Sequence, residues 1–257
     1  MKKLLLTLAC FILATGTASA IPIQLDPGAA LGAGFGTTGT FNQLQFYAQT
    51  TSTDTDATFS DIGDVAVKSL VASTPVDDAG LDNDWFLVGG WNDLVGVNPT
   101  TNTFVYTSGT LNLWATTTSY NFGSSIGAGD DSDFRNEDAN GVLVATLELR
   151  EGLGVIVPGP SGAQGTIDLV WDFTFMHDGF WLDENGQALS LMNLPDNFFF
   201  AIVDANTDQI IFNQDGTILS DHDGSVSIGV IPEPATMALF GTGLFGLAGA
   251  GIKRRKA

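Results

Sequence analysis

Hydrophobic and polar residues alternate along much of the chain between residues 21 and 230. In the segment TIDLVWDFTF (residues 166–175), every second residue from the isoleucine onward is apolar, and most intervening positions are polar. The segment GVLVATLELR (residues 141–150) alternates in the same way. Because a period of two is typical of a strand that buries one face, we predict a half-buried antiparallel strand in each segment.

Further short strands are predicted where apolar and β-branched residues recur between turn-forming residues. These segments are 41–49, 64–71, 110–117, 198–204, 209–212 and 225–230. Turn sequences rich in Gly, Asp, Asn or Pro occur at 78–80, 158–162, 184–186 and 214–216. No long apolar run in this region has helical spacing. The pattern predicts an all-β fold, an antiparallel β-sandwich or jelly-roll-like single domain.

Two polar stretches interrupt this pattern and are predicted to be loops. The first, TTSTDTDAT, covers residues 50–58, and the second covers residues 121–140. The second contains DDSDFRNED, in which five acidic residues lie within nine positions.

The charge of the chain is unevenly distributed. Between residues 21 and 230 there are 28 of the 29 acidic residues but only three bases, Lys68, Arg135 and Arg150, so the formal net charge of this region is −25. Such a surface repels phosphate backbones, which excludes nucleic acid as a partner. The chain also has 18 Phe residues, which supply enough apolar area for a folded core.

The N-terminus has the features of a secretory signal peptide. Lys2 and Lys3 precede an apolar stretch, and residues 18–20 read Ala-Ser-Ala. This order predicts cleavage after Ala20 by a signal peptidase. Because Cys10, the only cysteine, lies within the signal peptide, the mature protein is expected to have no disulfide.

The C-terminus has three consecutive features. Pro232, Glu233 and Pro234 form an extended segment, since proline is excluded from helix interiors and from central strands. Residues 235–252 are 18 uncharged residues, about 27 Å long as a helix, which is just enough to span a bilayer. Four bases follow and are expected to stay on the cytoplasmic side. They are Lys253, Arg254, Arg255 and Lys256.

Together these three features closely resemble the PEP-CTERM sorting signal, over about residues 231–257. The resemblance implies transient insertion into the inner membrane of a Gram-negative bacterium, where an exosortase removes the tail. The exported product would then be extracellular or attached to the cell surface. We therefore divide the chain into a signal peptide (1–20), an acidic extracellular β-domain (21–230) and a sorting segment (231–257).

A finer resemblance concerns the β-domain. Its size, its alternating strands and stretches such as FVYTSGTLNLWATT (residues 104–117) look like flocculation-associated PEP-CTERM proteins. This resemblance implies a non-enzymatic role in aggregation or biofilm formation, with exopolysaccharide or cell-surface glycans as partners.

Two catalytic motifs occur, and neither has its required context. Residues 34–39 match G-x-G-x-x-G, but no strand precedes them and no helix is predicted after them. Residues 123–127 match G-x-S-x-G, yet an acidic polar stretch follows in place of a helix. We therefore expect no catalytic residues and no enzyme activity.

The remaining candidate site is a calcium site in the acidic loop. Asp131, Asp133 and Glu137 offer hard oxygen ligands, which Ca²⁺ prefers, although the loop does not match the EF-hand pattern. The competing interpretation of the same loop is a solvated acidic segment without a cofactor. If it binds Ca²⁺, the alternative function is a Ca²⁺-dependent carbohydrate-binding module that recognises a defined glycan. The acidic stretch 77–84 offers a weaker version of the same chemistry.

Overall fold

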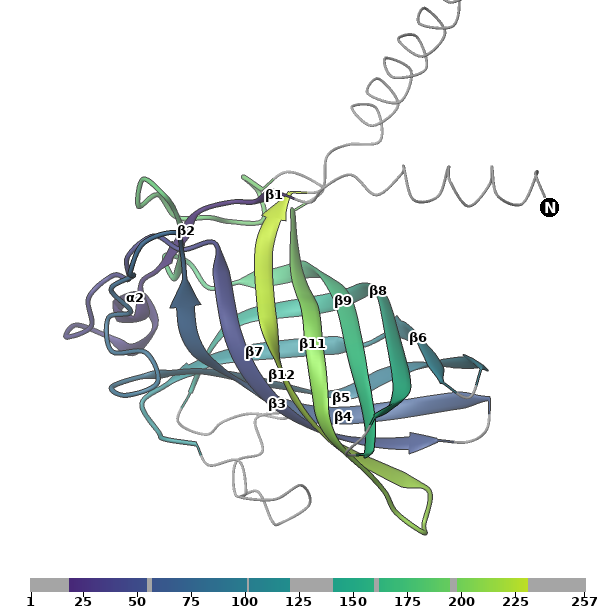
Figure 1. The fold of residues 1–257 in the computed structure, drawn as a ribbon. Helices are drawn as coiled ribbons and strands as arrows, with labels where there is room; N and C mark the ends of the chain where they lie inside the picture. The colour runs from purple at the N-terminus through teal and green to yellow at the C-terminus, as the bar shows by residue number, and fades with distance from the viewer. Residues whose placement is uncertain are drawn as a thin grey trace, which may run out of the picture.

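The computed structural model describes residues 19–54, 57–100, 102–120, 141–159, 162–194 and 198–230 (Figure 1). The sorting segment and all of the signal peptide except Ser19 and Ala20 lie outside these ranges. No helix in the described ranges has the length and apolar character needed to cross a membrane.

Strands dominate the described chain, and one short helix lies near its start. The elements are β1 (Ser19–Ala20), β2 (Ile23–Leu25), α2 (Pro27–Leu31), β3 (Gln43–Asp54), β4 (Thr58–Val71), β5 (Phe86–Thr100), β6 (Thr103–Ser108), β7 (Thr110–Thr116), β8 (Val142–Gly159), β9 (Gly162–Met176), β10 (Trp181–Asp183), β11 (Phe198–Phe212) and β12 (Thr217–Val230).

Ten of these strands form one antiparallel sheet that closes on itself. Strands β3, β4 and β5 pair in chain order, β6 and β7 both bridge β5 to β8, and β9, β11 and β12 follow. The sheet closes because β12 also pairs with β3, from Thr217 opposite Thr53 to Ser227 opposite Gln43. Figure 1 shows the strands wrapping around a common interior. Closure leaves β3 and β12 without a long unpaired edge.

The two ends of the closed sheet differ in their connections. At one end, which we call the open end, only two to four residues separate β3 from β4, β5 from β6, β8 from β9, and β11 from β12. At the other end, the covered end, longer segments join the strands. There β2 pairs with β10, with Leu25 opposite Trp181, and α2 lies beside them in Figure 1.

The hydrophobic core fills the covered end. Its largest side chains are fully buried and include three tryptophans, which the closed sheet and the β2–β10 pair enclose. Trp85, Trp171, Trp181, Phe41 and Phe180 are the largest members. Edge-to-face contacts link Phe180 to Trp85 and to Trp181, with ring centroids 6.2 and 5.3 Å apart. Such contacts favour one packing arrangement of the aromatic core.

The all-β antiparallel class predicted from the sequence is confirmed. The two layers expected of a sandwich are here opposite walls of one continuous sheet. The predicted turns at 78–80, 184–186 and 214–216 are present, with positive φ at Gly80, Gly186 and Gly216. Glycine tolerates this backbone conformation because it has no Cβ.

Two predictions, one of strands and one of a loop, had the wrong boundaries. Residues 198–204 and 209–212, predicted as separate strands, belong to the single strand β11. The polar stretch 50–58, predicted as a loop, continues β3 to Asp54 and begins β4 at Thr58. Polar residues form strands here because their side chains lie inside the open end of the sheet or face solvent.

The close approach of strands at Gly96 gives a test of this packing. A Cβ at this position of β5 would lie 2.2 Å from the Val105 carbonyl oxygen and 2.5 Å from Phe59 Cζ. We expect Gly96→Ala to lower the free energy of unfolding by about 1–3 kcal/mol, measured by urea denaturation. Gly36→Ala is the control, because no atom lies within 4 Å of its added Cβ. Equal stability of both variants would contradict the described approach of β5 to β6.

Candidate functional site

A pocket opens into the interior of the sheet at its open end. Including its mouth it encloses about 510 Å³, and its water-accessible cavity of about 40 Å³ has room for roughly three water molecules. One wall is polar and comes from β3, β4 and β12: Thr50, Ser52, Asp54, Asp61, Ser220 and His222. The opposite wall is mainly apolar and includes Phe59, Phe104, Tyr106, Ile156, Ile167, Ile210 and Ile218.

The alternation of each strand directs these side chains inward. On β3, Leu44, Phe46, Ala48 and Thr50 are buried at every second position, and Ser52 and Asp54 continue the same face to the mouth. The inward face of this strand therefore changes from apolar at the covered end to polar at the open end.

Asp61 of β4 is the most buried carboxylate of the polar wall, with 3% of its surface exposed. Trp91 Nε1–H donates to its Oδ1 at 2.8 Å, and the Ser52 hydroxyl donates to its Oδ2 at 2.8 Å. Burial raises the pKa of Asp61 to about 7, although these two hydrogen bonds favour the charged form. Asp61 is therefore poised to change its charge near neutral pH.

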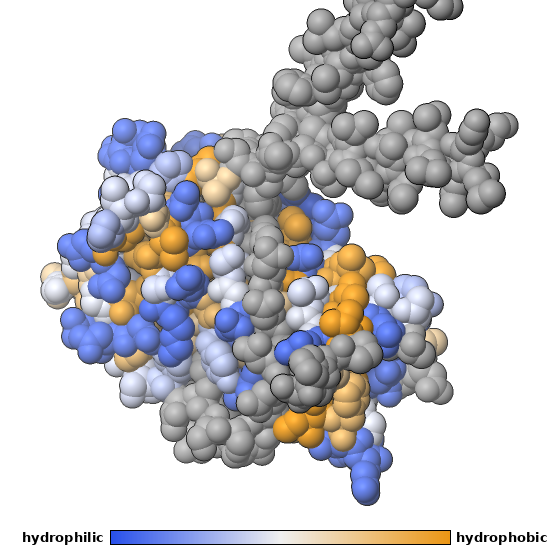
Figure 2. All heavy atoms as spheres, in the orientation of Figure 1, coloured by the Kyte–Doolittle hydropathy of each residue, from blue (hydrophilic) through white to orange (hydrophobic). Residues whose placement is uncertain are grey.

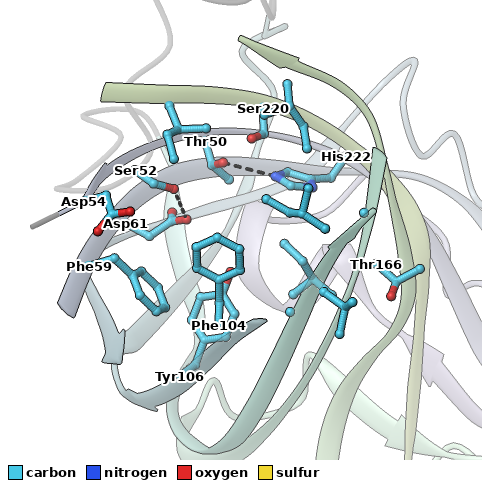
Figure 3. Close-up of a pocket in the computed structure, with 17 residues that line it drawn as sticks. Thr50, Ser52, Asp54, Phe59, Asp61, Phe104, Tyr106, Thr166, Ser220 and His222 are labelled. Atoms are coloured by element: carbon cyan, nitrogen blue, oxygen red, sulfur yellow. Dashed lines mark hydrogen bonds between the residues drawn. The ribbon is translucent and has the colours of Figure 1, made fainter. Parts of the chain in front are cut away.

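His222 lies on β12 in the same polar wall and is 5% exposed. Its Nε2 is 3.1 Å from the Thr50 hydroxyl, a hydrogen bond that joins β12 to β3 across the closure (Figure 3). Burial lowers the pKa of His222 to about 4, so the imidazole is neutral at physiological pH.

An aromatic cluster supports the apolar wall. The Phe59 ring makes edge-to-face contacts with Phe104 and Tyr106, with centroid separations of 5.5 and 4.9 Å. Burial, together with the charge of Asp61, raises the pKa of Tyr106 above its ordinary value. Figure 3 shows the Phe104 and Tyr106 rings beside one another beneath the polar wall.

A second cavity of about 30 Å³ lies deeper along the same interior. It shares Thr50, Asp61, Tyr106, Ile167 and His222 with the outer pocket, and it is also lined by Trp91 and Leu169. The polar side chains therefore form a layer between the aromatic core and the mouth.

The site residues predicted from the sequence lie elsewhere. Pro232, Glu233 and Pro234, the four bases 253–256, and the calcium candidates Asp131, Asp133 and Glu137 all lie outside the described residues. Ala20, the predicted last residue of the signal peptide, is described and pairs with Gly229 in β1 and β12.

Among the described residues, no three His, Cys, Asp or Glu side chains gather closely enough to hold a metal ion. In the acidic stretch 77–84, the Asp77 and Asp78 carboxylates instead accept hydrogen bonds from the Ala79 and Gly80 amides, both at 3.0 Å. These are turn contacts of the kind that Asp commonly makes with its own backbone.

The polar layer was not predicted from the sequence, because Thr50 and Ser52 lie in a stretch that was predicted to be a loop. One feature of the sequence does indicate the layer. Every second residue from Leu44 to Ser52 belongs to one face of the strand, and this face changes from apolar to polar along the strand. Asp61 and His222 carry no motif of their own. Only the closure of the sheet brings them into one pocket, since they are far apart in the chain.

Comparison with known proteins identifies the segment that follows the domain. The family model of the PEP-CTERM protein-sorting motif matches residues 230–255. The chain carries a PEP-CTERM sorting signal. No curated protein and no solved structure matches the chain. The PEP-CTERM motif supports export and sorting by an exosortase, as expected from the tail.

The PEP-CTERM segment continues from the covered end of the domain. Strand β12 runs from the pocket, at Ile218 and Ser220, to Val230, where the motif begins. At about 3.3 Å per residue, the mouth at Ile218 lies about 40 Å from the first residue of the motif. The pocket and the sorting segment are thus at opposite ends of the same strand.

The two buried titratable groups make opposite contributions to stability between pH 4 and 6.5. The folded protein holds the Asp61 proton more tightly than the unfolded chain does, so this contribution is lost as pH rises toward 7. The folded protein holds the His222 proton less tightly, so its contribution grows as pH rises from 4 to 6.5. Each group changes the free energy of unfolding by about 1.4 kcal/mol per pH unit, and in the native protein the two changes largely cancel.

Single substitutions should separate the contributions of Asp61 and His222 to the pH dependence of stability. Relative to the native protein, Asp61→Asn should gain stability as pH rises from 4.5 to 6.5, and His222→Gln should lose it, each by about 3 kcal/mol. Urea denaturation at the two pH values measures both. Asp168→Asn, on an exposed position of β9, controls for the loss of a carboxylate. The same pH dependence in all three variants would refute the assignment.

Proposed function

We propose that this chain is a non-enzymatic component of the extracellular matrix, exported, processed by an exosortase, and involved in exopolysaccharide-associated cell aggregation. The observation that carries the proposal is the PEP-CTERM motif placed directly after the last strand of the folded domain. A tail in this position tethers the finished domain to the membrane until it is removed.

The charge of the domain supports association with a matrix. Its formal net charge of −25 is too high for close contact with an anionic polymer without counterions. Divalent cations bridging carboxylates of the protein to those of the polymer would supply this contact, and carboxylate oxygens suit Ca²⁺. Such association needs many exposed acids and no single defined pocket.

The described basic residues of the domain already form ion pairs with neighbouring acidic residues. Arg150 Nε donates to Asp172 Oδ2 at 3.0 Å, and Lys68 lies 3.4 Å from Asp82 Oδ1. Arg135 lies outside the described residues. The described bases therefore do little to reduce the acidic character of the surface.

A glycan-specific lectin has less support. Sugar-binding modules stack sugars on exposed aromatic faces, but Trp85, Trp91, Trp171 and Trp181 are at most 5% exposed. Trp114 is half-buried and packs against a small cluster formed by Ala66, Phe86 and Val88. The described tryptophans therefore serve the packing of the domain.

The processing step is tested by the intact mass of the exported protein. In cells with the matching exosortase, the mass should correspond to a chain that begins at Ile21 and ends close to Glu233. Without the exosortase, the protein should keep Arg255 and remain in the membrane fraction. An exported product that retains Arg255 in exosortase-containing cells would contradict the proposal.

The matrix association is tested by sedimentation of the exported protein with host exopolysaccharide. Retention should require Ca²⁺ or Mg²⁺, fall with EDTA, and fall with added monovalent salt because the contacts are screened. Neutralising three exposed acids of β8 and β9 together should lower retention. The variant is Glu148→Gln, Glu151→Gln and Asp168→Asn.

The matched control changes three exposed neutral residues of β9 and leaves the charge unchanged. It combines Gln164→Asn, Thr166→Ser and Thr174→Ser. Retention equal to that of the native protein is expected for the control. If the neutralised variant is retained as well as the control, the surface carboxylates are not the binding groups.

A further inference from the structure

We propose that the open end of the sheet binds a slender amphiphile, an apolar chain with a hydrogen-bond-donating head group that is not anionic. This site is separate from the exposed carboxylates of the proposed matrix function. It consists of the outer pocket together with the deeper cavity that shares its polar layer.

The polar layer indicates a binding role because packing alone does not favour it. Thr50, Asp61, Ser220 and His222 each have 6% or less of their surface exposed, in an interior that is otherwise apolar. Burying a carboxyl group and an imidazole costs stability that apolar side chains of similar size would not cost. A bound head group that hydrogen-bonds to this layer would recover part of that cost.

The shape of the pocket selects a slender ligand. Apolar side chains from β4, β6, β8, β9 and β11 surround the space, and the cavity holds only a few water molecules. The fixed edge-to-face contacts of Phe59 with Phe104 and Tyr106 narrow it on one side. We therefore expect a single alkyl chain that lies partly in the cavity and partly in its mouth, and not a sugar ring or a fused ring system.

The head group is selected by charge. The pocket lining contains two carboxyl groups, Asp54 and Asp61, and no Lys or Arg. The hydroxyl and carboxylate oxygens of the polar wall accept hydrogen bonds from an alcohol or an ammonium group. A carboxylate head group would meet the like charge of Asp54, and above about pH 7 also that of Asp61, which disfavours it.

The surroundings of the mouth favour an apolar ligand. Val157 and Phe212, close to the open ends of β8 and β11, are 51% and 61% exposed. Figure 2 shows hydrophobic residues on this side of the molecule, with others over the covered end. The mouth also lies about 40 Å from the start of the sorting segment, so it stays accessible while the tail is in the membrane.

The test compares three ligands that share one octyl chain: 1-octanol, octylammonium and octanoate. Each is titrated into the exported protein and followed by the indole N–H resonances in NMR. The Trp91 resonance, assigned with Trp91→Phe, reports on the site because this group donates to Asp61. We expect it to shift with the alcohol and the ammonium, which should bind about tenfold or more tightly than octanoate.

Two variants locate the binding. A Cβ at Gly154 would make ordinary contacts of 3.4 Å or more, so Gly154→Leu should fill the pocket and weaken octanol binding about tenfold or more. Gly36→Leu is the matched control, since its Cβ meets no atom within 4 Å. Asp54→Lys, at the exposed mouth, should bring octanoate binding close to that of octanol.

The outcomes separate this proposal from the matrix function. If none of the three ligands shifts the Trp91 resonance, or if octanoate binds as tightly as octanol to the native protein, the proposal is overturned. Undiminished binding by Gly154→Leu also overturns it. If Gly154→Leu does not fold, Asp54→Lys decides alone, and unchanged discrimination against octanoate counts against the site. Retention on exopolysaccharide is measured separately and does not depend on these results.

Discussion

The pairing of β3 with β12 is the interaction on which the rest of the structure depends. Eleven consecutive residue pairs join these strands without a register shift, between segments about 170 residues apart in the chain. Side chains reinforce the pairing, because Gln49 donates to Asp221 at 2.9 Å on one face and Thr50 bonds His222 on the other. Bringing such distant segments together costs chain entropy, which the many hydrogen bonds of the paired strands must offset.

Closure also divides the interior into two unlike regions. At the covered end, large aromatic side chains fill the space and provide most of the apolar burial. At the open end, polar residues and glycine share the interior with the aromatic cluster of Phe59, Phe104 and Tyr106, and cavities remain. Gly154 on β8 faces Tyr106, and its missing side chain leaves part of this space, because an added Cβ would lie 3.4 Å or more from every neighbour. The tightly packed covered end thus supports a less tightly packed open end, and binding sites are commonly found in such less tightly packed regions.

The sequence predicted the parts of the fold that local alternation determines. The strands around Trp171 and Leu147 and the glycine turns were identified because each follows from a few neighbouring residues. Phe175 shows the limit of this reasoning, since it continues the apolar face of Trp171 yet is 39% exposed. Register shifts between β8 and β9 around Leu147 and Leu149 change which residues face inward. Such shifts depend on the partner strand and leave no trace in one segment alone.

The candidate site was not predictable for a related reason. Thr50 and Ser52 look like loop residues in isolation, and they are strand residues because β4 and β12 pair with them on either side. Asp61 and His222 acquire their shifted pKa values from burial that only the complete sheet provides. The sorting signal was the opposite case. All of its features lie within one continuous segment, so the sequence alone identified it.

The two ends of the described chain lie side by side, since Ser19 is the register partner of Val230. Ile21 keeps a hydrogen bond from its N–H to the Ile228 carbonyl at 2.9 Å, beyond the predicted signal-peptide junction. A domain whose ends meet in this way is suited to circular permutation. A short linker would connect residue 230 to residue 21, and new ends would open in the exposed turn at 213–216. The same geometry makes the domain a unit that can be inserted into a loop of another protein without stretching either chain.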